Sequence, residues 1–172
     1  GNLTHKFNSE HCDAFQSPNY PILAEAGVSI KYNYVRIQKP SSLKMKASFD
    51  FDTNIAILKI FPGISKNVVD AILSTKGLKA VVLETFGSGN APNSEWFIDA
   101  LDAASKRGIL IYNVSQCNAG TVKQGAYETS EGLAKIGVVS GKDITTEAAV
   151  AKLMYLLGKK LTRKQIEKYL TQ

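Results

Sequence analysis

From residue 55 onward, short apolar runs alternate with longer segments whose apolar residues recur at the spacing of a helix. The apolar runs lie at 55–61, 80–85, 109–114 and 138–139, and the helical segments begin near residues 65, 94, 130, 145 and 162. Parallel strands need a crossover connection, which is usually a helix packed on the sheet. The alternation therefore predicts an α/β fold: a three-layer αβα domain with a mainly parallel, four-stranded Rossmann-like sheet.

Helix start and stop residues fall where these segments need them. Ser65 and Thr145 each precede an apolar stripe and can cap a helix. Thr162 and Gln165 have the spacing of a capping box. Gly158 is expected to end the helix that begins after Thr145.

Residues 1–48 lack this regularity. They are polar, and prolines at 18, 21 and 40 interrupt them. Their expected elements are a turn at 17–21, one helical turn at 22–26 and a short strand at 28–34. We predict that residues 1–48 form a linker and edge segment that packs against something else, and that residues 49–172 form the α/β domain. Because the chain begins with Gly rather than Met, its natural N-terminus is expected to lie upstream.

Charge and cysteine content indicate which partners to expect. The formal charge of +6 comes from dispersed lysines that do not alternate with aromatic residues, so no nucleic-acid partner is predicted. No apolar stretch approaches the roughly 18 residues that cross a membrane, so no membrane partner is predicted. Cys12 and Cys117 lack metal-ligand spacing, which predicts no metal site and fits a reducing, cytoplasmic compartment.

Three loops should follow the carboxyl ends of the strands, where α/β sheets bind ligands near a switch in strand order. They are 62–65, 86–93 and 115–129. The second begins with Gly87 and Gly89, and it delivers Asn90 to the start of a helix. Pro92 stands where a dinucleotide fingerprint has its third glycine, and there is no Walker lysine, so no nucleotide cofactor is predicted. A small-molecule site and a tight turn in which Asn90 bonds nearby backbone remain open.

The other polar residues near these loops each have two interpretations. Cys117 is either a thiol nucleophile or a small packing residue, and no histidine is near enough in sequence to activate it. Glu84 is either catalytic or a carboxylate at the sheet rim or at a subunit contact. Glu128 is either functional or solvated. Because there is no serine–histidine pair at plausible loop positions and no G-x-S-x-G elbow, these residues do not assemble an active site by themselves.

Several motifs in order resemble one family. Leu83 to Pro92 contains G-x-G-N-A-P, residues 113–127 read NVSQCNAGTVKQGAY, and residues 137–153 read GVVSGKDITTEAAVAKL. With FQSPNYPILAEAG at 15–27 and FPGIS at 61–65, they are similar to the C-terminal domain of bacterial cytoplasmic, type I L-asparaginases. The resemblance covers essentially the whole chain. It implies an amidohydrolase that converts L-asparagine and water to L-aspartate and ammonia, without a cofactor, as a homodimer or dimer of dimers.

In that family the catalytic threonines lie in T-G-G-T and T-D-T motifs of an N-terminal domain, and neither motif occurs in this sequence. The resemblance therefore implies that this chain alone is inactive. Asn90 matches a residue that reaches into the partner subunit's active site and helps to hold the bound amino acid, a task suited to an amide that both donates and accepts hydrogen bonds. Glu128 lies near a position where some members place a carboxylate toward the substrate ammonium.

Some type I enzymes bind an effector asparagine between the loop that contains the G-x-G-N-A-P motif and a loop with a T-Q-C motif. The corresponding candidate effector loop comprises Glu84, Phe86, Gly87, Ser88, Gly89, Ser115, Gln116 and Cys117. Glu84 stands where the allosteric members carry an arginine. A glutamate would repel an effector carboxylate, which argues against activation by asparagine, but the sequence leaves open whether asparagine is an effector. The alternatives are a stand-alone amino-acid-binding module and the asparaginase-like subunit of a tRNA-dependent amidotransferase.

Overall fold

The computed structural model describes residues 1–125 and 128–171, without the side chains of 128–130. Its strands are β1 (His5–Lys6), β2 (Phe15–Gln16), β3 (Ala24–Ala26), β4 (Ile30–Tyr32), β5 (Ile55–Lys59), β6 (Ala80–Thr85), β7 (Leu110–Ser115) and β8 (Val139–Ser140). Its helices are α1 (Lys66–Leu73), α2 (Glu95–Lys106), α3 (Glu128–Lys135), α4 (Thr146–Gly158) and α5 (Arg163–Leu170).

The central sheet is four-stranded and parallel, in the order β5-β6-β7-β8, which confirms the predicted fold class. Val82 of β6 pairs with Ile57 of β5 and with Tyr112 of β7. All carboxyl ends lie at one edge of the sheet, as expected. However, the strand order among the described residues follows the chain without reversal, so a site at this edge cannot lie at a switch in strand order.

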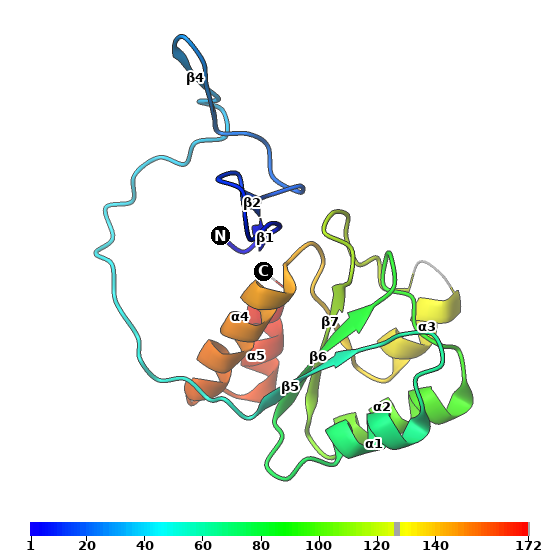
Figure 1. Ribbon diagram of the computed structural model, residues 1–172. Coiled ribbons are helices and arrows are strands. Elements are labelled where there is room, and N and C mark those ends of the chain that lie inside the picture. Colours follow the sequence, from blue (N-terminus) through cyan, green and yellow to red (C-terminus); the bar gives the residue numbers. More distant parts are fainter. Residues whose placement is uncertain (126–127, 172) are drawn as a thin grey trace.

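Helices cover both faces of the sheet (Figure 1). Sequential right-handed crossovers place α1, α2 and α3 on the same face. There Val69, Phe97 and Leu133 pack against the inward residues of the strands, such as Val81 and Leu83. The chain then crosses to the opposite face, where α4 and α5 bury Ala149, Leu153, Leu156, Ile166 and Leu170 against Val82, Tyr112 and their neighbours.

The predicted helix starts are confirmed. Ser65 Oγ accepts the backbone N–H of Val68, Thr145 Oγ1 accepts that of Ala148, and Thr162 and Gln165 form the capping box. Gly158 is the last residue of α4, but not because the backbone turns left-handed there. The segment before β5 passes so closely that a Cβ on Gly158 would overlap the backbone oxygen of Asp50.

Residues 1–52 contribute no buried residue to the core. The turn at 17–20 and a strand inside 28–34 are present, but the helical turn predicted at 22–26 is wrong. That stretch contains β3, which pairs antiparallel with β4 and places Glu25 opposite Lys31. Cross-strand pairing, which the local sequence does not reveal, satisfies the backbone there. This hairpin projects away from the α/β domain, whereas β1 and β2 lie near the start of α4 (Figure 1).

Candidate functional site

The loop after β6 is a tight, internally bonded turn, hereafter the glycine loop (residues 86–90). Phe86 and Asn90 exchange two backbone hydrogen bonds of 2.9 Å, and the N–H of Gly89 also donates to the carbonyl of Phe86. Gly87 and Gly89 have φ angles of +49° and +108°. Because L side chains rarely adopt such conformations, the two glycines let the chain reverse and fix the backbone position of Asn90.

Gly89 is also a close-packing position. A Cβ added there would lie 2.8 Å from Cγ1 of Val122 and 3.5 Å from Nδ2 of Asn113. At Gly87 a Cβ would meet nothing within 4 Å. The loop after β7 therefore lies directly against Gly89, and position 89 has no room for a side chain.

Hydrogen bonds join the glycine loop to the loop after β7. Ser115 Oγ donates to the carbonyl of Gly87 at 2.6 Å, and the N–H of Lys123 donates to the carbonyl of Ser88 at 2.9 Å. The N–H of Cys117 donates to Ser115 Oγ, while the Cys117 thiol is exposed and forms no disulfide. The structure thus brings together the second and third loops identified from the sequence.

Gln116 directly follows β7 and forms hydrogen bonds to the backbone at the carboxyl ends of β5 and β6. Its Nε2 donates to the carbonyls of Ile60 and Glu84 at 2.6 and 2.9 Å, and its backbone N–H donates to the carbonyl of Thr85. The side-chain amide donor is therefore engaged with the backbone after β5 and within β6. Gln116 shapes the carboxyl edge of the sheet.

Glu84 lies near the carboxyl end of β6, where its carboxylate is buried rather than exposed to solvent. Glu84 is only 9% exposed and lies on the same face of β6 as Val82, against α4. The hydroxyl of Thr146, in the first turn of α4, donates to Oε1 at 2.5 Å, and Lys59 Nζ lies 3.5 Å from Oε2. A carboxylate is stabilised there because the N-terminus of a helix carries partial positive charge.

Three polar residues of this region were not identified from the sequence. Thr85 and Asn113 are fully buried, Asn113 lies beside Gly89, and the Thr85 hydroxyl donates to Asn113 Oδ1 at 2.7 Å. Asn19 exchanges two hydrogen bonds of 2.8 Å with the backbone of Gly120. A polar residue near the end of an apolar strand is a usable signal for Thr85 and Asn113. Asn19 gives no comparable signal, because its partner is 101 residues away.

The remaining predicted positions are placed as follows. Glu128 is the first residue of α3, and its side chain lies outside the described part of the structure. Asn90 is half-buried at the end of the glycine loop. Among the described residues, no three His, Cys, Asp or Glu side chains gather in a way that could hold a metal ion. No helix in the described part of the chain has the length and apolar character to cross a membrane.

Comparison with known proteins gives a consistent assignment. Residues 54–170 match the Glutaminase/Asparaginase C-terminal domain. Over 176 aligned residues the chain is 39% identical to L-asparaginase 1 of Escherichia coli K12, with all of this chain and 51% of that protein aligned. It is 29% identical to a subunit of the glutamyl-tRNA(Gln) amidotransferase of Pyrococcus abyssi, which aligns with 98% of this chain and 38% of that protein.

A solved structure extends the match to three dimensions. The crystal structure of L-asparaginase I from Vibrio cholerae superposes with a TM-score of 0.89 at 38% identity, covering 99% of this chain and 52% of that one. The chain thus spans about half the length of these asparaginases. The resemblance drawn from the motifs is confirmed: this chain belongs to the glutaminase/asparaginase C-terminal domain family.

Proposed function

We propose that this chain works as the C-terminal domain of an L-asparaginase, which hydrolyses L-asparagine to L-aspartate and ammonia. The observation that carries the proposal is the glycine loop, held by its own hydrogen bonds and by the loop after β7, with Asn90 at its end. Family membership and the similarity to two L-asparaginases support it. The nucleophile would come from polypeptide outside these residues.

In this proposal Asn90 reaches into the active site of a partner subunit and binds the substrate's amino-acid end. A side-chain amide can donate to a carboxylate and accept from an ammonium group without adding charge. Cavities of about 740 and 410 Å³ lie between α1 and α2 and within the N-terminal segment, away from the glycine loop. Neither of these two cavities encloses Asn90. The protein would then act as a homodimer or dimer of dimers in the cytoplasm.

We further propose that this enzyme is not activated by asparagine. The loops of the candidate effector site are adjacent, but Glu84 brings a carboxylate that binds Thr146 and Lys59. A glutamate cannot form the bidentate pair with the carboxylate of a second amino acid that an arginine would form. Initial rates against asparagine concentration should therefore follow a hyperbola, and a sigmoidal curve would contradict this part of the proposal.

The direct test uses protein expressed from the complete reading frame and measures ammonia release from L-asparagine. Replacing Asn90 with alanine should raise KM about tenfold, the effect of losing one or two substrate hydrogen bonds. Asn93→Ala is the matched control, because Asn93 is an exposed amide three residues away. No ammonia release by the unaltered protein, or equal KM values for the two variants, would refute the proposal.

Contribution across subunits has a separate test. An Asn90→Ala subunit is co-expressed with a subunit whose upstream nucleophile threonine is replaced. In a mixed dimer one active site then has both an intact nucleophile and an intact Asn90 from the other subunit. Activity above that of either variant alone supports action in trans, and no gain in isolated mixed dimers contradicts it.

The similarity to an amidotransferase subunit makes ammonia supply to a tRNA-linked partner the second candidate. Ammonia release from L-asparagine in the absence of tRNA and of any partner favours the asparaginase. A stand-alone amino-acid-binding module is the third. Calorimetric titration of the 172-residue chain with asparagine and aspartate tests it, because a free-standing sensor binds these ligands without further polypeptide.

A further inference from the structure

One side-chain amide connects the N-terminal segment to the loop after β7. Asn19 Nδ2 donates to the carbonyl of Gly120, and the N–H of Gly120 donates to Asn19 Oδ1, both at 2.8 Å. Gly120 has a φ of +100°, which favours glycine. Such an exchange requires a donor and an acceptor on one short side chain. Asparagine supplies both, whereas aspartate of nearly the same size supplies only acceptors.

The turn that carries Asn19 is itself anchored. The N–H of Tyr20 donates to the carbonyl of Ser17 at 2.9 Å, and Pro18 between them fixes one backbone dihedral angle. The hydroxyls of Ser17 and Thr4 are hydrogen-bonded at 2.9 Å. The residues just before Thr4 reach the α/β domain, where Asn2 O accepts the N–H that precedes α4. Asn19 is therefore presented from a fixed position.

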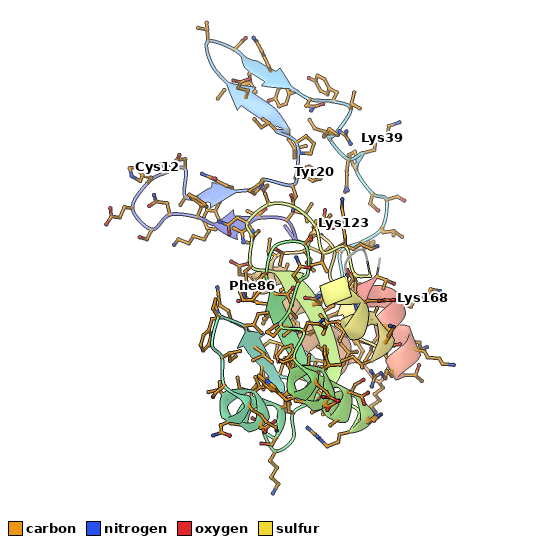
Figure 2. The ribbon with its side chains drawn as sticks, turned by 90° about the vertical axis from the view of Figure 1, so that its right-hand side faces the viewer. Cys12, Tyr20, Lys39, Phe86, Lys123 and Lys168 are labelled. Carbon is orange, nitrogen blue, oxygen red and sulfur yellow. The ribbon has the colours of Figure 1, made fainter. Side chains whose placement is uncertain are left out.

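The loop that Asn19 holds is the one that contacts the glycine loop. Gly120 lies between Ser115 and Lys123, which bond the carbonyls of Gly87 and Ser88. In Figure 2, Lys123 lies between Tyr20, which ends the turn, and Phe86, which begins the glycine loop. Asn19 is thus connected to the glycine loop by its hydrogen bonds to Gly120, by the short stretch of chain from Gly120 to Lys123, and by the hydrogen bond from Lys123 to Ser88.

We propose that Asn19 is a positioning residue. Its two hydrogen bonds to Gly120, hereafter the clasp, hold the loop after β7, and this loop holds the glycine loop so that Asn90 is correctly placed. The inference rests on the proposed function of Asn90. It gives the N-terminal segment a role in substrate binding that acts through the glycine loop. Loss of the clasp first makes Gly120 more mobile. The hydrogen bonds of Ser115 and Lys123 to the glycine loop then become weaker.

The experiment compares Asn19→Ala and Asn19→Asp with Asn33→Ala in protein from the complete reading frame. Asn33 is the matched control, because its amide donates to the carbonyl of Ile22 within the same segment and not to the loop. Hydrogen–deuterium exchange is followed in peptides covering 86–92 and 116–125. Both Asn19 variants should exchange about tenfold faster there, as expected for losing hydrogen bonds of ordinary net strength, and Asn33→Ala should not.

The same variants are assayed on L-asparagine. Asn19→Ala should raise KM about fivefold and change kcat less than twofold, because placement of a substrate-binding group is affected and not the chemical step. In an Asn90→Ala background it should raise KM no further, since the residue that it positions is gone. A general loss of structure would change kcat and persist in that background.

Three results would overturn the proposal: unchanged exchange in both peptides, a KM equal to that of Asn33→Ala, or a KM effect that multiplies with that of Asn90→Ala. If Asn19→Ala does not fold, Asn19→Asp provides the same comparison with nearly the original volume. If the unaltered protein releases no ammonia, the proposed function fails and with it the role assigned here to Asn19 in substrate binding. Exchange still reports whether the clasp orders the glycine loop.

Discussion

Replacing Gly89 with alanine should destabilise the protein about three times as much as the same replacement at Gly87. The two residues belong to one loop and both have positive φ angles, +108° and +49°. Only at Gly89 does a Cβ also collide with a neighbour, Cγ1 of Val122 at 2.8 Å. Gly87→Ala therefore measures backbone strain, and Gly89→Ala measures strain and overlap together.

The magnitudes follow from these two contributions. At Gly87 the left-handed conformation costs an alanine about 1–2 kcal/mol, and the stiffer unfolded chain returns roughly 0.5 kcal/mol, leaving about 1 kcal/mol. At Gly89 the strain is about 1–3 kcal/mol, and forcing a methyl group against packed neighbours adds about 1–3 kcal/mol. The expected net loss there is about 3 kcal/mol.

Thermal unfolding measures the difference. For a domain of this size, each 1 kcal/mol lowers Tm by roughly 3 °C, so the expected shifts are about 3 °C and about 9 °C. Repeating Gly89→Ala in a Val122→Ala background removes the colliding atom, and the penalty should fall toward that of strain alone. Equal Tm shifts for the two glycines, or an undiminished penalty in that background, would refute the steric reasoning.

Tyr112→Phe should cost about 1 kcal/mol in urea unfolding at pH 7, because the buried carbonyl of Leu170 loses a hydroxyl that donates to it at 3.1 Å. Burial raises the pKa of Tyr112 to about 12. The protonated form therefore stabilises the native state below pH 10, and this contribution is lost as the pH rises to 12. The free energy of unfolding of Tyr112→Phe should fall less than that of the unaltered protein between pH 10 and pH 12. A hydrogen bond from Lys79 lowers the pKa of Asp52 from 3.8 to about 2. The stabilisation that ionised Asp52 provides is therefore present above pH 4 and lost as the pH falls to 2. In Asp52→Asn the free energy of unfolding should depend less on pH across that range. Glu84→Gln should lose about 1 kcal/mol at pH 7 by removing a negative charge from the start of α4, and unchanged urea unfolding would contradict a structural role for Glu84.

The elements of the α/β domain could be predicted because their signals are local. The strand at 80–85, the caps Ser65 and Thr145 and the box of Thr162 with Gln165 each depend on neighbours within one or two turns. The crossover rule then limited the fold to a parallel sheet with helices on its faces. The two loops of the candidate site were also predictable, because carboxyl ends of parallel strands share one edge.

What the sequence by itself determined about this protein is therefore its periodic framework and the motifs that place it in a family. Tertiary structure alone decided which way Glu84 points, why α4 ends at Gly158 beside Asp50, and that 24–26 is a strand. It also joined Asn19 to Gly120 across 101 residues. The physical reason is the same in each case: the partner that satisfies the charge, the backbone or the packing is distant along the chain, and only folding brings it within hydrogen-bond or van der Waals range.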